Sequence, residues 1–95
     1  MSVHLAIESS QRCGGVAVRD ATGTVRTTSL ESASGVDDQL MPAIKQLFTE
    51  AEAQPQDLSL IGVSIGPGGF TGLRVAVSTA RTLAMTTGCR VVAVP

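Results

Sequence analysis

The first third of the chain consists of short runs in which apolar and polar residues alternate. The apolar run Val3–Glu8 is too short for a typical helix and is followed by turn-forming residues, so it predicts a strand. Residues 15–19 continue in the same way, residues 20–23 have the composition of a turn, and residues 24–30 are rich in β-branched side chains. The pattern therefore predicts a three-stranded antiparallel meander.

The rest of the chain alternates between helical and strand patterns. Residues 58–65 predict a strand, and residues 73–87 predict a second helix that ends at Gly88. A last strand is expected at Arg90–Val94. Before these elements, residues 37–53 predict a helix because their apolar side chains recur at the spacing of one helical face, namely Leu40, Met41, Ile44, Leu47, Phe48 and Ala51.

The connections between the later strands decide the predicted topology. Strand, helix and strand in succession indicate parallel neighbours, because an antiparallel pair needs only a short turn. The sequence therefore predicts an α/β fold of order βββαβαβ, with a mixed five-stranded sheet. Two crossovers in one direction leave the other sheet face open, where residues such as Ala6, Ala17 and Val91 need burial. We therefore expect this chain to lack part of the complete architecture.

Composition and charge exclude several classes of function. The 95 residues carry a net charge of -1, and the basic residues are scattered singly, which does not suit a phosphate backbone. The two aromatic residues, Phe48 and Phe70, are too few for a stacking platform for bases. No apolar run reaches the length of a membrane helix, and the start lacks both halves of a secretory signal. We expect a cytoplasmic protein that binds neither nucleic acid nor membrane by itself.

Residues that could hold a metal or form a disulfide are few. Cys13 and Cys89 lack the spacing of a zinc site, and the predicted topology places them at opposite edges of the sheet, so we expect two free thiols. His4 is the single histidine and has no second ligand nearby, which indicates a structural role. Glu8 ends the first strand, where a carboxylate either faces solvent or contacts a metal or partner.

A glycine-rich segment lies between the strand at 58–65 and the second helix. Glycines there allow positive φ angles and close approach of the backbone, and Thr71 is placed to cap the helix. The segment is then either a tight capped turn or a weak anion site made by Gly66, Gly68, Gly69 and Thr71. It matches neither a Walker loop nor a dinucleotide fingerprint.

The same segment carries a family resemblance. Residues 64–74 read Ser-Ile-Gly-Pro-Gly-Gly-Phe-Thr-Gly-Leu-Arg, which is similar almost residue for residue to the Ser-Ile-Gly-Pro-Gly-Ser-Phe-Thr-Gly-Leu-Arg signature of the TsaB (YeaZ) family. The opening Leu-Ala-Ile-Glu-Ser-Ser resembles the family's Leu-Ala-Ile-Asp-Thr-Ser, and Leu-Met-Pro at residues 40–42 resembles Leu-Leu-Pro. Glu8 stands where the family usually has Asp, and Val36 where many members have His.

The resemblance implies a fold and an extent of the chain. The family has the architecture of the actin-like and sugar-kinase-like ATPase superfamily, built from two lobes of RNase H-like topology. Family members are about twice as long, so residues 1–95 would form the amino-terminal lobe, with the second lobe absent from this chain.

The resemblance also implies a function. Such a protein is a non-catalytic partner of tRNA threonylcarbamoyladenosine (t6A) synthesis, which binds and activates the catalytic subunit TsaD, while a TsaE protein supplies ATPase activity. ATP and metal are then expected on the partner subunit, with no cofactor on this lobe alone. Family interfaces, in homodimers and with TsaD, use the first two helices, which gives six candidate interface residues: Met41, Lys45, Leu73, Arg74, Val77 and Arg81.

Two questions stay open at this stage. The small residues Ala76, Ala80 and Ala84 form a stripe on the second helix, which packs either on its own sheet or against a second subunit. The alternative functions are half of a small ATPase-fold enzyme, kinase or glycoprotease-like, and a degenerate dimerisation module. The chain has no cluster of His, Cys or carboxylates suited to catalysis, which favours the partner role.

Overall fold

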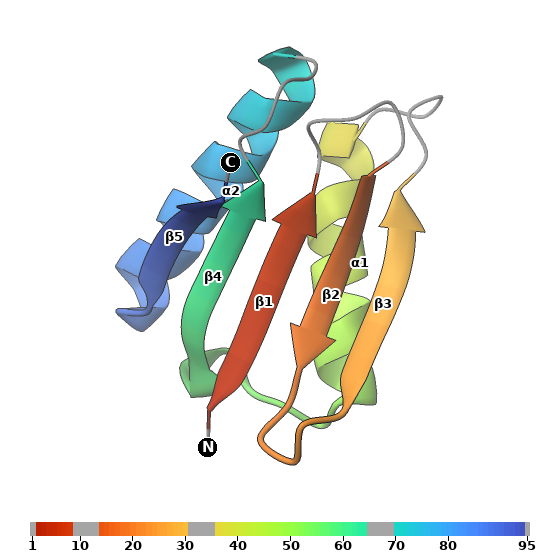
Figure 1. The fold of residues 1–95 in the computed structure, drawn as a ribbon, viewed down its shortest axis with the longest axis vertical. Coiled ribbons are helices and arrows are strands. Elements are labelled where there is room, and N and C mark those ends of the chain that lie inside the picture. The colour runs from red at the N-terminus through yellow and green to blue at the C-terminus, as the bar shows by residue number, and fades with distance from the viewer. Residues whose placement is uncertain (1, 9–13, 31–35, 65–69, 95) are drawn as a thin grey trace.

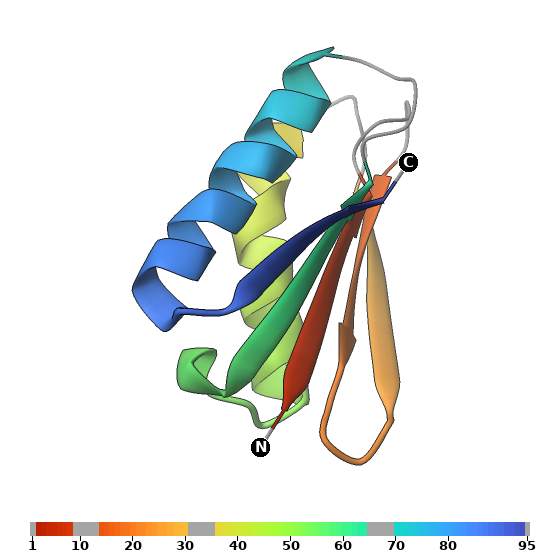
Figure 2. The same cartoon turned by 60° about the vertical axis from the view of Figure 1, so that its left-hand side comes forward.

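A mixed β-sheet with two helices on one of its faces makes up the described structure (Figures 1 and 2). The computed structural model describes residues 2–8, 14–30, 36–64 and 70–94. Within these ranges the elements are, in chain order, β1 (Val3–Glu8), β2 (Gly14–Arg19), β3 (Val25–Leu30), α1 (Val36–Glu50), the short 3-10 turn η2 (Pro55–Asp57), β4 (Leu58–Ser64), α2 (Phe70–Thr87) and β5 (Arg90–Val94).

The strands lie in the order β3-β2-β1-β4-β5. Strand β2 pairs antiparallel with both β1 and β3, whereas β4 pairs parallel with β1 and β5. The predicted α/β fold, its element order and its mixed sheet are confirmed. The parallel pairs follow from the two helical connections, because α1 and α2 each carry the chain back along the sheet (Figure 1).

One face of the sheet holds the hydrophobic core. Leu5 lies beside Val18 on one side and Ile61 on the other, and Ile7 lies beside Val63. Aligned residues on neighbouring strands point to the same face, so these side chains form a continuous apolar layer. Each of them has an exposed fraction of 2% or less. The layer is the surface on which the helices pack.

Both helices cover this apolar layer from the same side (Figure 2). Helix α1 contributes Leu40, Ile44 and Leu47, which are fully or almost fully buried. Helix α2 contributes Ala76 and Ala80, each with an exposed fraction of 0%. The small-residue stripe therefore packs on the chain's own sheet, and the alternative that it meets a second subunit is wrong for these two residues. Their small size lets α2 lie close to the strands.

The other face of the sheet is open, as predicted. Small residues form the middle of this face, where Ala6 aligns with Ala17 on one side and with Gly62 on the other. The row continues to Thr27 beside Ala17 and to Val92 beside Gly62. A shallow hollow of about 410 Å³ lies over this row. The expectation that Val91 faces this side is wrong: Val91 aligns with the buried Ile61 and so belongs to the helix-covered face. Strand alternation then places Val92 and Val94 on the open face.

The end of α1 differs from the sequence prediction. The helix ends at Glu50 and not at residue 53. The Ala53 N–H donates to the Phe48 carbonyl at 3.0 Å, and the Glu52 N–H donates to the Thr49 carbonyl at 3.1 Å. This is the Schellman arrangement, and it places Glu52 in the left-handed region with φ of 54°. Because glycine usually occupies this position, a glutamate there does not indicate the end of a helix.

The start of α2 also differs from the prediction, whereas its end agrees. The helix begins at Phe70, three positions before the predicted residue 73, and ends at Thr87. Gly88 follows with φ of 76°, and its N–H donates to the Ala84 carbonyl at 2.7 Å. The predicted glycine cap is confirmed. No helix in the described ranges is both long enough and apolar enough to cross a membrane.

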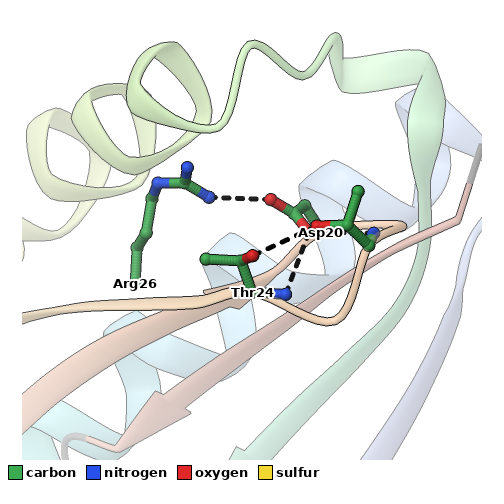
Figure 3. A network of polar contacts seen from close by, with 4 residues as sticks. Asp20, Thr24 and Arg26 are labelled. Carbon is green, nitrogen blue, oxygen red and sulfur yellow. Dashed lines mark hydrogen bonds and ion pairs between the residues drawn. The ribbon is translucent and has the colours of Figure 1, made fainter.

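The turn between β2 and β3 is held by one carboxylate (Figure 3). Asp20 Oδ1 accepts hydrogen bonds from the backbone N–H groups of Thr22 at 2.9 Å and Thr24 at 3.1 Å, and from the Thr22 hydroxyl. Its Oδ2 accepts a charged hydrogen bond from Arg26 at 2.8 Å. The Thr22 hydroxyl first, and the Arg26 guanidinium second, lower the pKa of Asp20 to about 2.

Replacing Glu52 with glycine is expected to stabilise the chain. The left-handed conformation is strained for Glu and unstrained for Gly, so Glu52→Gly raises the free energy of unfolding by roughly 0.5 to 1 kcal/mol. Urea denaturation measures the change. Glu52→Ala is the control, because it removes the charge but keeps a Cβ atom on the strained left-handed backbone. An equal gain in both variants would assign the effect to charge and contradict the backbone explanation.

Enlarging the buried stripe of α2 is expected to destabilise the fold. Ala80→Leu inserts three carbon atoms where the helix lies against the sheet, and overpacking of this kind lowers the free energy of unfolding by about 1 to 3 kcal/mol. The control is Ser78→Leu, at an exposed position of the same helix, where we expect a change within about 0.5 kcal/mol. Similar effects in the two variants would mean that Ala80 is not in a packed layer.

The Asp20 network predicts a specific pH dependence. Because its folded pKa lies below the ordinary 3.8, ionised Asp20 stabilises the folded state above that pH, and this contribution is lost as pH falls towards 2. Asp20→Asn should lower the thermal midpoint at pH 6, with the difference from the parent chain shrinking between about pH 4 and pH 2. A difference that stayed constant over this interval would exclude the charge of Asp20 as its source.

Candidate functional site

The candidate residues of α1 lie in a groove between the two helices. Met41 is 37% exposed and Lys45 is exposed. Together with Phe48, with Pro55 and with Leu83 of α2 they line an apolar depression of about 340 Å³. Met41 is at the margin of the helix's apolar face, so it is partly covered by the core and partly available to a partner.

The two candidate arginines of α2 lie on the side of that helix turned away from the core. Arg74 and Arg81 are exposed, and Val77 between them is half-buried against the core. They share a shallow depression with three further residues, and we call the six together the α2 outer side: Arg74, Val77, Ser78, Arg81, Thr82 and Met85.

The structure brings five of the six predicted interface residues into two groups. Met41 and Lys45 share the groove beside α1, whereas Arg74, Val77 and Arg81 share the α2 outer side. Both groups belong to the single layer of helices that covers the sheet (Figure 2). The side chain of the sixth, Leu73, lies outside the described residues, although its backbone is part of α2.

Met85 is the residue that sequence reasoning missed. Its exposed fraction is 88%, the highest among the exposed large hydrophobic residues of the described chain. It follows Arg81 by four positions, so helical geometry places the two side chains next to each other on one surface. That spacing is visible in the sequence, but the six interface candidates came from the family resemblance, and Met85 was not among them.

Helix α2 carries positive charges only, whereas α1 carries charges of both signs. Within the part of the chain that the structure describes, Arg26 with Asp20 is the ion pair that forms, so Lys45, Arg74 and Arg81 have no carboxylate partner. Helix α2 contains two arginines and no acidic residue. Helix α1 contains Asp37, Asp38 and Glu50 besides Lys45, and Glu50 accepts a hydrogen bond from the Gln46 side chain at 3.0 Å.

The predicted anion site lies largely outside the described residues. Gly66, Gly68 and Gly69 lie outside the described residues, so this part of the prediction stays untested. Thr71 is the second residue of α2, which begins at Phe70, so the expectation that Thr71 caps the helix from outside is wrong. Only the backbone of Thr71 is described.

The remaining candidate residues do not gather into a chemical centre. Glu8 is half-buried at the end of β1 and lines the hollow of the open face with Ser64. His4 lies on the same face and aligns with Arg19 and Leu60. In the described ranges, no three His, Cys, Asp or Glu residues come together as a metal site.

Of the two cysteines and Val36, the structure describes the side chain of Cys89 alone. Cys89 is a free, half-buried thiol packed against the core, in agreement with the expectation for this residue. Cys13 lies outside the described residues. Val36 is the first residue of α1, and its side chain is likewise not described.

Comparison with known proteins gives the family of the chain. Residues 31–95 match a protein-family model described as TsaD, tRNA N6-adenosine threonylcarbamoyltransferase. This match includes both helices, the glycine-rich segment and the parallel strands β4 and β5.

Two curated relatives are similar over most of the chain. The tRNA threonylcarbamoyladenosine biosynthesis protein TsaB of Bacillus subtilis is 39% identical over 82 residues, which cover 84% of this chain and 35% of the relative. A probable bifunctional tRNA threonylcarbamoyladenosine biosynthesis protein of Thermoplasma acidophilum is 33% identical over 90 residues, or 95% of this chain and 16% of that protein.

A solved structure agrees with these relatives. YeaZ from Pseudomonas aeruginosa superposes with a TM-score of 0.90 at 29% identity, covering 99% of this chain and 44% of that one. The chain thus spans less than half the length of each of these proteins. Its sequence, its fold and the matched family model agree, and the chain belongs to the TsaD-type family and, within it, to the TsaB (YeaZ) proteins.

Proposed function

We propose that this chain is the non-catalytic partner subunit of the t6A modification machinery, and that it binds and activates a TsaD catalytic subunit. The relatives' names assign them to threonylcarbamoyladenosine synthesis, and the family model that matches two thirds of the chain is that of the transferase itself. Proteins that share a fold often pair through equivalent surfaces, which supports a complex between this chain and its larger relative. We place this activity in the cytoplasm.

The observation that carries the proposal is the composition of the exposed helical surface. Interfaces between proteins are enriched in Met and Arg and depleted in most other charged residues. Here Met41, Met85, Arg74 and Arg81 are all exposed on the helical layer. Met85 and Arg81 are one helical turn apart, so these two interface-enriched residue types lie together on the α2 outer side.

The absence of catalytic groupings in the described residues supports a non-catalytic role. General acid-base or metal chemistry needs titratable side chains that converge on one point. His4 and Glu8 lie near opposite ends of β1, Cys89 lies just before β5, and no cluster of metal ligands forms among the described residues. The carboxyl ends of β1 and β4 offer Glu8 and Ser64, which do not make up a divalent-cation site of several oxygen ligands.

The cofactors of the reaction are therefore assigned to other subunits. We propose that ATP and the metal bind to TsaD and that a TsaE-like protein supplies the ATPase activity. The role of this chain is then to hold TsaD in its active arrangement by contact alone. Binding that favours one of two conformations shifts their populations by the difference in its affinity for them.

The first test is complex formation with the TsaD of the same organism. Size-exclusion chromatography with light scattering should show a complex of defined mass between this chain and TsaD, with circular dichroism confirming that the chain is folded. A folded chain that does not bind TsaD at micromolar concentrations would refute the claim that these 95 residues suffice for the interaction.

A single substitution tests the surface. Met85→Asp should weaken TsaD binding by at least about 10-fold, since it places a charge in a contact that excludes water. The control is Thr27→Asp, on the open sheet face and exposed, which should bind as the parent chain does. Equal binding by both variants would place the interface away from the α2 outer side.

A further inference from the structure

We propose that the open face of the sheet binds the phosphate backbone of RNA through three basic side chains, Arg19, His4 and Arg90, which we call the cationic row. The inference rests on the proposed function, because that function places the chain in a machinery whose substrate is a tRNA. It adds a surface of this chain that contacts the tRNA, on the side of the sheet opposite the helices.

The cationic row is formed by strand register. His4 of β1 aligns with Arg19 of β2 and, on its other side, with Leu60 of β4. Leu60 in turn aligns with Arg90 of β5. Because side chains alternate between the two faces of a strand, these residues lie on the same face as the residues two positions away, which are Ala6, Ala17, Gly62 and Val92. All three basic side chains therefore belong to the open face.

This arrangement removes the reason for expecting no contact with nucleic acid. That expectation rested on basic residues that stand singly along the sequence. In the sheet, three strand intervals of about 4.8 Å separate β2 from β5, so the backbones of Arg19 and Arg90 lie about 14 Å apart with His4 between them. Long arginine side chains at this spacing can contact separate phosphates of one backbone.

The two arginines are free to bind an anion. Both are exposed, and neither forms an ion pair within the described residues. Asp20 follows Arg19, but its Oδ2 pairs with Arg26 at 2.8 Å and its Oδ1 accepts N–H bonds of the turn (Figure 3). The charge of Asp20 is therefore compensated within the turn, and the charges of Arg19 and Arg90 are not.

The charge of the open face sets the direction of the bound backbone. Among the described residues of this face, Glu8 is the carboxylate, and it lies four positions from His4 along β1, or about 13 Å. Cations and carboxylate are thus at opposite ends of the face. A phosphate backbone is attracted along the cationic row, across the strands, and is repelled from the end of the face that holds Glu8.

A hollow beside the row gives a phosphate group room to approach. It measures about 230 Å³ and is lined by Ser2, His4, Arg19, Asp20, Ala21 and Gly23. A Cβ atom added to Gly23 would lie 4.0 Å from Arg19 Nη2, so the Arg19 guanidinium lies beside this glycine. Guanidinium and imidazole N–H groups both donate to phosphate oxygens.

The composition of the row favours RNA over an acidic protein surface. Protein interfaces have an apolar centre with charged residues at the rim. In the cationic row the charged residues themselves form the line, and the apolar residue between His4 and Arg90 is the half-buried Leu60. A line of cations with little apolar surface suits a phosphate backbone, whose recognition is mainly electrostatic.

Charge reversal tests the row. At about 50 mM salt, R19E/R90E should bind an unmodified tRNA transcript at least about 10-fold more weakly than the parent chain, because two attractive charges become repulsive. The matched control is R74E/R81E, which makes the same change of charge at two exposed arginines on the helix-covered side and should lose no more than about 3-fold. Fluorescence anisotropy measures all three. Equal losses in the two variants, or no binding by the parent chain, would overturn the inference.

A neutral variant separates lost contacts from introduced repulsion. In the parent chain the logarithm of the tRNA affinity should fall with the logarithm of the salt concentration with a slope of about -2, and R19Q/R90Q should remove most of this dependence. Circular dichroism checks that both open-face variants are folded. A folded R19Q/R90Q with the affinity and the salt slope of the parent chain would overturn the inference.

Binding to TsaD separates this inference from the proposed function. R19E/R90E should bind TsaD as the parent chain does, because the cationic row lies on the sheet face opposite the helices. Loss of TsaD binding in R19E/R90E, with tRNA binding unchanged, would make the row a protein interface and overturn the inference. A parent chain that binds tRNA through the row but does not bind TsaD would support the inference and refute the proposed partner.

Discussion

The parallel pairing of β1 with β4 is the contact on which the arrangement of this chain depends. It joins residues that are more than fifty positions apart and aligns Leu5 with Ile61 and Ile7 with Val63. Each side chain of this size stabilises the fold by about 1.5 to 3 kcal/mol when it is fully buried. The pairing therefore creates the apolar layer, and α1 must cross over that layer to connect the meander with β4. The position of α2 follows from the same surface, since α2 connects β4 with the next parallel strand.

Much of this arrangement could be predicted from the sequence because the apolar pattern and the topology depend on the same residues. The alternation in Val3–Glu8 and the helical period across Leu40, Ile44 and Leu47 each identify one buried face, and the structure buries these faces against each other. Helix ends were less predictable, because they depend on hydrogen bonds that no periodicity reveals. Glu52 takes the left-handed position of a helix stop although its side chain does not favour that conformation.

The candidate site was predictable in part. The resemblance to the family identified Arg74 and Arg81, but the stripe of alanines, which had the more regular pattern, lies in the core. A row of small residues reads the same in sequence whether it lies against a sheet of the same chain or against a partner, because both need close approach. The face of Val91 was mistaken for a related reason: one residue of strand register decides to which side a side chain points. The alignment of Val91 with the buried Ile61 shows that Val91 lies on the helix-covered face.

Gly62 lies at the centre of the open sheet face, between Ala6 and Val92. A methyl group added at this position would meet no other atom within 4 Å, so nothing in the described structure requires a glycine there. Glycine weakens a strand, and a β-branched residue would suit the backbone better. The fold itself therefore does not require a residue without a side chain at this point of the open face. Any layer that rests on it, from whatever source, can approach the strand backbone itself.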